Sequence, residues 1–331
     1  MRQPIKLVGS RGGERFLQGR SRLISVRPMA REHLLDFSQS PARLSVSLDR
    51  LKIRIENQPE KYIPLADIAV VVVLHPNVSY SQAVLSGLMQ AGGAFVCCGA
   101  NRLPNGLLLP LADNGTQSER FTAQAEASKP VCKRLWKQIT KAKIDAQATA
   151  LEVVRGTDCG LRSLLPLVKS GDSTNIEARA ARRYWLRLFA DRGFRRNPEL
   201  EDENELLNYG YAVVRAIVGR AICAAGMHPT IGLHHHNRYN AFCLADDLME
   251  PLRPVVDVAV WRLVVQERVA ELTPPSKRKL IAAIHARYAV SGEQRQLFDV
   301  ASRMASSLSQ VFLGQRKDLE LPEFTPLSFA T

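Results

Sequence analysis

The sequence predicts an α+β protein in which a β-rich N-terminal domain is followed by a larger all-α catalytic domain. Three observations support this. Apolar and polar residues alternate in the first third of the chain, which is the period of half-buried strands. From residue 119 onward, apolar residues recur every three or four positions, which is the period of helices. With 46% hydrophobic and 23% charged residues, the chain has a globular composition.

The N-terminal part is expected to contain a hairpin, two buried strands and a helix. Alternation over 43–48 and 51–55 predicts two strands joined by a tight turn at Leu48–Leu51. The unbroken apolar runs 70–74 and 94–98 predict buried strands, and 79–91 has the spacing of a helix between them.

Turn residues crowd 101–106, and the β pattern ends soon afterwards. We therefore predict a first domain over 1–111, a linker over 112–115, and a helical domain over 112–331. Segments with helical spacing, separated by Pro and Gly, are 119–128, 130–154, 161–169, 175–192, 203–225, 242–250, 254–272, 276–288 and 295–313.

The chain is strongly basic. It has 45 Lys and Arg against 32 Asp and Glu, a formal net charge of +13, and such a surplus attracts polyanions such as nucleic acid. Two helical segments, 129–143 and 179–196, hold much of this charge. A merely solvated helix face is the other interpretation of such segments.

The sequence favours a cytoplasmic protein with no membrane partner. Its six cysteines form no C-x-x-C pair, which predicts free thiols in a reducing compartment. The first 13 residues lack the apolar core of a secretory signal. The longest apolar run, 68–74, is far too short to span a bilayer.

One window is dense in residues that bind metals. Three of the seven histidines stand side by side, and three acids follow within one predicted helix: His234, His235, His236, Asp246, Asp247 and Glu250. Clustered carboxylates repel one another unless a cation lies between them, and oxygen ligands with one imidazole suit Mg²⁺ or Mn²⁺. An exposed acidic helix end is the other interpretation. A zinc site is disfavoured, because no cysteine pair or H-E-x-x-H pattern is present.

Glu177 is the second candidate. It stands alone among small and apolar residues at the start of the predicted helix 175–192. A lone acid there is also explained by its attraction to the positive end of the helix. Spacing alone does not bring it near the cluster.

Five stretches occur in the same order as the motifs of a known family: 175–178 with 181–185, 206–211, 226–229 with 231–235, 237–242, and 244–254. In these stretches the sequence resembles the CRISPR-associated spacer integrase (Cas-one) family, and it is most similar to the variant found with Cas-nine systems. The resemblance implies a divalent metal, Mg²⁺ or Mn²⁺, bound by Glu177, His235 and Glu250, with Asp247 as a supporting acid. The spacing to Glu250 favours His235, and His234 is the alternative register.

The resemblance also implies a reaction and partners. The reaction would insert short foreign DNA segments into a CRISPR repeat array by attack of a 3′-hydroxyl on a phosphodiester. The implied partners are double-stranded DNA, a second copy bound through domain 1–111, and a small Cas-two dimer that bridges two such homodimers. The expected phosphate contacts are Arg179, Arg182, Arg183, Arg187, Arg238, Lys133, Lys137 and Lys141.

Three other functions remain open at this stage. A stand-alone metal-dependent DNA-repair nuclease would use the same ligands with water as the nucleophile. A non-catalytic DNA-binding scaffold would need the basic residues but not the acids. An RNA-processing enzyme would differ in its substrate.

Overall fold

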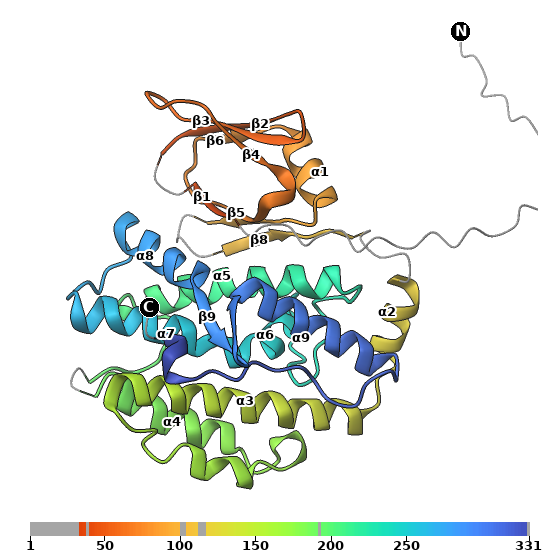
Figure 1. Ribbon diagram of the computed structural model, residues 1–331, viewed down its shortest axis with the longest axis vertical. Helices are drawn as coiled ribbons and strands as arrows, with labels where there is room; N and C mark the ends of the chain where they lie inside the picture. The colour runs from red at the N-terminus through yellow and green to blue at the C-terminus, as the bar shows by residue number, and fades with distance from the viewer. Residues whose placement is uncertain (1–32, 38–39, 100–103, 112–116, 191–192, 330–331) are drawn as a thin grey trace, which may run out of the picture.

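The structure is a computed structural model, and it describes residues 33–37, 40–99, 104–111, 117–190 and 193–329. A small part built of sheets lies above a larger helical part (Figure 1). The predicted α+β class, with the sheets first and the helices after, is confirmed.

Two four-stranded sheets form the N-terminal part. The first has the order β1-β5-β7-β8, with β8 antiparallel to its neighbour and the other pairs parallel: β1 His33–Phe37, β5 Ile68–Val73, β7 Ala94–Cys98 and β8 Pro104–Leu108. The second has the order β4-β3-β2-β6: β4 Lys61–Pro64, β3 Arg50–Arg54, β2 Ala42–Ser47 and β6 Val78–Tyr80. The helix α1, Gln82–Gln90, connects β6 to β7.

Opposite faces of the first sheet belong to different cores. Ile68 and Val71 pack with Leu44 and Leu51 of the second sheet. Val70 and its neighbours on the other face join the core of the helical part. Strand β5 is therefore buried on both faces, as its unbroken apolar sequence predicted.

The predicted hairpin is confirmed. Strands β2 and β3 pair antiparallel, and Leu48 and Asp49 between them have φ of 49° and 56°, as a two-residue turn of this kind requires. The turn predicted at 101–106 is only partly testable, since 100–103 lie outside the described residues. From Pro104 the chain is already strand β8, so the later half of that prediction is wrong. The predicted linker 112–115 also lies outside the described residues.

The C-terminal part is mostly helical. Its α-helices are α2 Gln117–Ala125, α3 Lys129–Arg155, α4 Ile176–Leu188, α5 Glu203–Ala224, α6 Cys243–Met249, α7 Arg253–Trp261, α8 Pro274–His285 and α9 Leu297–Phe312. The short helical turns are η2 Arg162–Leu167, η3 Ser170–Asp172, η4 Glu250–Leu252, η6 Pro326–Phe329 and the π-turn η5 Arg262–Gln266.

Helix α3 runs through this part, with α4 on one side and α7 and η4 on the other (Figure 1). Pro130 stands in its first turn, where no amide donor is missed. Gly156 ends it with φ of 75°, in the left-handed conformation that glycine adopts without strain. Most of its second half is buried, and that half holds Lys143.

A hairpin interrupts the helices. Strands β9, Arg287–Val290, and β10, Glu293–Gln296, pair antiparallel around Ser291 and Gly292, whose φ values are positive. The expectation of an all-α domain is corrected here, because helical spacing over 276–288 concealed the first strand. Two four-residue strands are too short for their alternation to outweigh that spacing.

Two further expectations concern cysteines and membranes. All six cysteines are free. No helix in the described ranges is both long and apolar enough to cross a bilayer.

Gly210 allows α5 to lie directly on α7. A Cβ added there would be 2.4 Å from Val256 Cγ1. We expect Gly210→Ala to lower the free energy of unfolding by about 1–3 kcal/mol, because an extra carbon in a packed contact forces the helices apart. Urea denaturation measures this.

Gly219→Ala on the same helix is the matched control. Its added Cβ would meet Leu107 at an ordinary 3.4 Å, and alanine favours the helix by up to about 1 kcal/mol. Equal stability losses in both variants would contradict the close approach at Gly210.

Candidate metal and DNA site

Near the middle of α3, Lys143 brings the predicted Glu177 and Glu250 together. His235 pairs with Asp247 and is close enough to Glu250 to interact with it electrostatically. Three segments meet α3 there: the start of α4, the loop 231–241, and η4 immediately after α6. Helix ends and loops are positions whose backbone groups lack helical partners, so each of these segments needs its own anchor.

Glu177 is fixed by a buried aspartate. Asp172 accepts the amide of Ile176 and the amide of Glu177, both at 2.9 Å, and so caps the start of α4. Asn175 precedes the helix in the left-handed region, with φ of 54°. The Glu177 side chain then reaches α3, where its Oε1 lies 2.6 Å from Lys143 Nζ.

Glu250 lies at the start of η4 and is only 4% exposed. Its Oε1 accepts from Arg253 Nε at 2.9 Å, and its Oε2 lies 2.5 Å from Lys143 Nζ. Burial acts to raise the pKa of this carboxyl, but the positive charges of Arg253 and Lys143 outweigh it and lower the pKa to about 2. Glu250 is therefore ionised at neutral pH.

Lys143 joins the two glutamates. Its ammonium lies within 2.6 Å of an oxygen of each, so both carboxylates approach one point in space. Burial acts to lower the Lys143 pKa, yet Glu250 and Glu177 reverse this and raise it, so the side chain stays charged. The spacing in the sequence did not predict that Glu177 lies near the acidic cluster, but in the structure it shares Lys143 with Glu250.

Asp247 organises the histidine loop. It is fully buried, and its carboxylate accepts the amides of Leu233 at 2.6 Å and His234 at 2.9 Å. Its Oδ1 also lies 2.6 Å from Nδ1 of His235. A Cβ at Gly232 would meet the His235 carbonyl at 2.4 Å, so only glycine permits this tight loop.

The contact with Asp247 sets the state of His235. It raises the His235 pKa, against the lowering effect of burial. With Nδ1 bonded to the carboxylate, Nε2 is the nitrogen left for another partner, an arrangement typical of metal-binding histidines. His235 and Glu250 lie close enough to shift each other's pKa.

The neighbouring histidines have other surroundings. The His234 ring stacks on Trp136 of α3, with 4.2 Å between the ring centroids and parallel planes. His236 is exposed. His234 is therefore fixed by an aromatic contact, and His235 by a carboxylate.

In the parts of the chain that the structure describes, no three Asp, Glu, His or Cys side chains are grouped as a ready-made metal site. The reason is visible in the contacts, because the Lys143 ammonium lies between the two glutamates. Glu250 Oε2 is nevertheless buried without a hydrogen bond of normal geometry, since the ammonium approaches it only as an ion pair. Two convergent carboxylates and an oriented imidazole are a donor set that fits Mg²⁺ or Mn²⁺.

A cavity of about 470 Å³ is lined in part by arginines, and none of Glu177, His235 and Glu250 lines it. Arg253, which holds Glu250, also lines it, together with Arg215, which pairs with Asp246 at 2.7 Å. The predicted site did not include these arginines, although Arg253 lies within the recognised stretch 244–254 and Arg215 follows the stretch 206–211 by one helical turn. The signal that could have found Arg253 is its place three residues after Glu250 in a helical stretch.

Behind the cavity, a buried acid ties three helices together. Asp257 of α7 accepts hydrogen bonds from the hydroxyls of Tyr184 on α4 and Tyr211 on α5. Burial raises its pKa to about 7, although both tyrosines act to lower it. The Arg253 guanidinium lies 4.6 Å from the centre of the Tyr211 ring.

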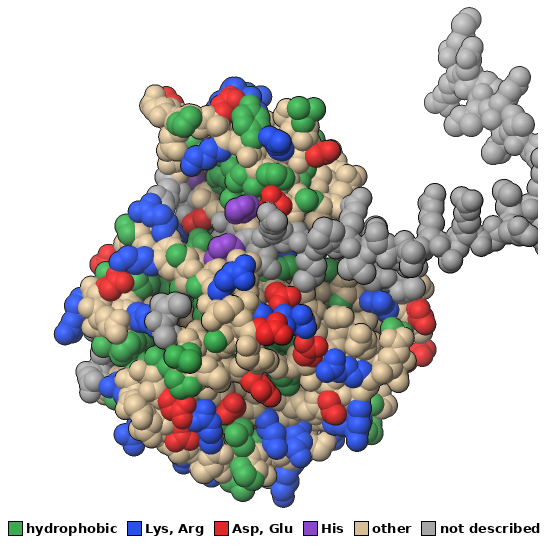
Figure 2. Space-filling view, viewed as in Figure 1, with side chains coloured by type: hydrophobic (Ala, Val, Ile, Leu, Met, Phe, Trp, Pro, Cys, Tyr) green, Lys and Arg blue, Asp and Glu red, His purple; other side chains and the backbone are tan. Residues whose placement is uncertain are grey.

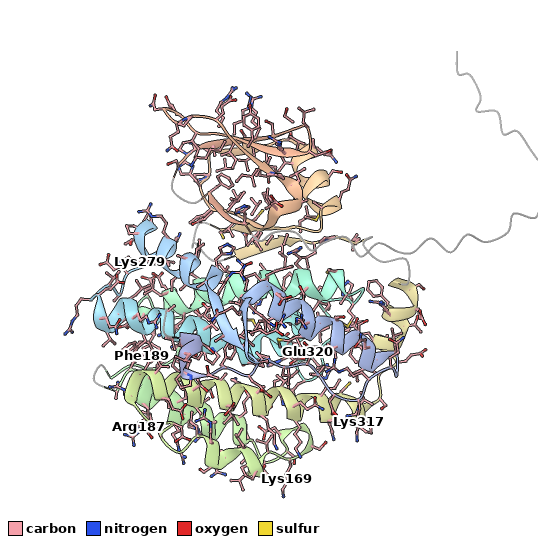
Figure 3. All side chains as sticks on the ribbon, viewed as in Figure 1. Lys169, Arg187, Phe189, Lys279, Lys317 and Glu320 are labelled. Atoms are coloured by element: carbon pink, nitrogen blue, oxygen red, sulfur yellow. The ribbon has the colours of Figure 1, made fainter. Side chains whose placement is uncertain are left out.

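The residues predicted to contact DNA differ in their exposure and in whether they already donate hydrogen bonds within the protein. Arg179, Arg182 and Arg187 are exposed on α4, whereas Arg183 donates to the Gly160 carbonyl at 2.7 Å. Figure 3 places Arg187 at the outer surface of the lower end, and Lys and Arg side chains gather at this end in Figure 2.

The remaining predicted contacts lie on α3 and the histidine loop. Lys133 is exposed, and Lys137 and Lys141 are partly so. Arg238 is exposed beside Tyr239, with 4.7 Å between its guanidinium carbon and the ring centre. These cations therefore flank the elements that carry Glu177 and His235.

Comparison with known proteins finds relatives of this chain both in sequence and in fold. A curated relative, the "CRISPR-associated endonuclease Cas1" of Neisseria meningitidis serogroup C (strain 8013), is 36% identical over 288 residues, which cover 85% of this chain and 94% of the relative.

Two solved structures share the fold. A "Casposase bound to integration product" has a TM-score of 0.73 at 18% identity, covering 87% of this chain and 92% of the other. A "Cas6-RT-Cas1--Cas2 complex" has a TM-score of 0.67 at 15% identity, covering 87% of this chain and 35% of that longer one.

The family match extends well beyond the site. The family described as "CRISPR associated protein Cas1" matches residues 37–277, which include the second sheet, the first sheet apart from most of β1, the histidine loop and all the acids discussed above. The chain belongs to the CRISPR associated protein Cas1 family.

Proposed function

We propose that this protein is a metal-dependent DNA integrase that inserts short duplexes into a CRISPR repeat array. A 3′-hydroxyl of the incoming duplex would attack a phosphodiester at the edge of a repeat, so that a new P–O bond forms as the P–O3′ bond of the repeat strand breaks. The attacking hydroxyl gives up its proton, and the displaced 3′-oxygen of the repeat takes one up. The observation that carries the proposal is the convergence of Glu177 and Glu250 from separate segments on one point of α3. Membership of the family supports the same reaction class.

Glu177, Glu250 and the Nε2 atom of His235 would hold the Mg²⁺ or Mn²⁺ ion. The ion would act as a Lewis acid that polarises the phosphodiester and stabilises charge on its oxygens. Asp247 would hold the imidazole in the required tautomer, and Arg253 would keep Glu250 ionised and in place.

DNA would lie across the basic residues that flank this site. Arg238 on the histidine loop and the exposed arginines of α4 would contact phosphates, which positions the duplex without reading its sequence. Arg215 and Arg253, which line the cavity, would offer further positive charge to the bound strand.

The proposed assembly is a homodimer that contacts a small Cas2 dimer. One of the structural neighbours is a complex of Cas1 with Cas2, which supports the second partner. The domain 1–111 is proposed as the dimerising part, because pairing between copies would cover the edges of its sheets.

The main test is a strand-transfer assay. A labelled duplex with free 3′-hydroxyls and a supercoiled plasmid carrying a repeat array are incubated with the protein, its small partner and Mn²⁺. We expect joined products that disappear with EDTA and in Glu177→Gln, His235→Ala and Glu250→Gln, because each substitution removes a ligand.

The matched control is Glu152→Gln. Glu152 is a half-buried glutamate, as Glu177 is, and it pairs with Arg162. It should join DNA normally. Cleavage without joining would indicate a repair nuclease instead. A preference for RNA would indicate an RNA-processing enzyme, and unaltered function in Glu250→Gln would indicate a scaffold.

Asp247 is predicted to act through His235. We expect Asp247→Asn to reduce the joining rate about 10- to 100-fold, because the imidazole loses the acceptor that orients it. Calorimetric titration with Mn²⁺ should show weaker binding in the same variant. Normal Mn²⁺ affinity and normal joining in a folded Asp247→Asn protein would refute this role.

The exposed arginines of α4 are predicted to bind phosphates. In Arg179→Ala/Arg182→Ala, the slope of log affinity for duplex DNA against log salt should fall by about 0.9 for each phosphate that is no longer neutralised. Fluorescence anisotropy at several salt concentrations measures this slope. The control Arg303→Ala/Arg316→Ala removes the same charge from arginines that pair with Glu320. Equal changes of this slope in both variants would mean that DNA affinity depends on the net charge of the protein and not on the arginines of α4.

A further inference from the structure

Lys143 lies where a divalent cation would have to bind. Its ammonium is 2.6 Å from Glu177 Oε1 and 2.5 Å from Glu250 Oε2, and the residue is only 9% exposed. A buried ammonium is costly unless carboxylates lie against it, and here two of them do. The contact is therefore a built feature of the fold.

The charges around the site explain why a cation is needed there at all times. Glu177 and Glu250 bring two negative charges to one point, and Arg253 offsets one of them through Glu250 Oε1. Without a further positive charge, the two glutamates would repel each other or take up protons. Lys143 supplies that charge in the metal-free protein.

We propose that Lys143 is the resident cation of the metal-free site and that a divalent metal ion takes its place between Glu177 and Glu250. Lys143 is then a positioning residue: it holds the two carboxylates together before metal arrives and competes with the metal for them. This inference rests on the proposed metal site and adds an exchange of one cation for another.

Two features make the exchange feasible. Lys143 donates a hydrogen bond to Glu177 Oε1 and forms an ion pair with Glu250 Oε2, and a divalent ion would replace both contacts with the same two carboxylates. Lysine carries its charge on a flexible stem of four carbons, so the ammonium can withdraw without movement of α3.

The test uses Lys143→Met in the full-length protein, with Mn²⁺ titrated calorimetrically in the absence of DNA. Methionine keeps an unbranched apolar side chain but removes the competing charge. We expect Mn²⁺ to bind about tenfold more tightly than in the wild type, or more, a factor equivalent to about 1.4 kcal/mol. In EDTA the variant should have a lower melting temperature than the wild type, because its unpaired carboxylates destabilise the metal-free state. Addition of Mn²⁺ should raise the melting temperature of the variant by more than that of the wild type.

Lys129→Met on the same helix is the control, since Lys129 is exposed and has no ion-pair partner among the residues described. It should bind Mn²⁺ as the wild type does. Unchanged or weaker Mn²⁺ binding in Lys143→Met, with binding still lost in Glu250→Gln, would overturn the exchange and leave the metal site intact. Absence of Mn²⁺ binding in the wild type would overturn both.

A second measurement needs no variant. The wild-type protein is treated with an amine-acylating reagent, with and without Mn²⁺, and modification is mapped by mass spectrometry. We expect Lys143 to be protected in EDTA and to react faster with Mn²⁺, relative to Lys141 in the same sample. Equal protection under both conditions would contradict displacement of the ammonium.

Discussion

A positive charge buried in the middle of α3 is the constraint on which this part of the structure depends. The Lys143 ammonium is tolerated there only because carboxylates lie against it. Those carboxylates come from the start of α4 and the start of η4, which are distant from each other in the sequence. Satisfying one buried charge therefore attaches two further segments to α3 and places two acids side by side.

Two buried aspartates hold the start of α4 and the histidine loop in place, as Lys143 holds the two glutamates. Asp172 accepts the first free amides of α4, and Asp247 accepts amides of the histidine loop. In each case a carboxylate takes the place of missing backbone partners. The side chains of Glu177 and His235 are consequently held by elements as well defined as a helix interior, which a reactive site requires.

The periodicity of the sequence was sufficient to predict most helices and strands, but it did not predict the contacts between them. The hairpin at Leu48–Leu51 and the long helices follow from local spacing and turn residues, which act over a few positions. The β9–β10 hairpin was missed because a helical pattern ran through its first strand. The union of Glu177 with Glu250 depends on Lys143, and no local pattern reveals which buried lysine meets which acid. Resemblance to a family supplied the ligand set, whereas the pairing partner had to come from the structure.

A second set of contacts keeps the two glutamates together without Lys143. Tyr184, about two turns after Glu177 on the same face of α4, donates to Asp257, and Tyr211 donates to the same carboxyl. The Tyr211 ring lies against Arg253, whose Nε holds Glu250. Helix α4 and η4 are thus connected through α7 and α5 as well as through the ammonium. Withdrawal of Lys143 would therefore leave the carboxylates near each other, which is what the proposed exchange of one cation for another requires.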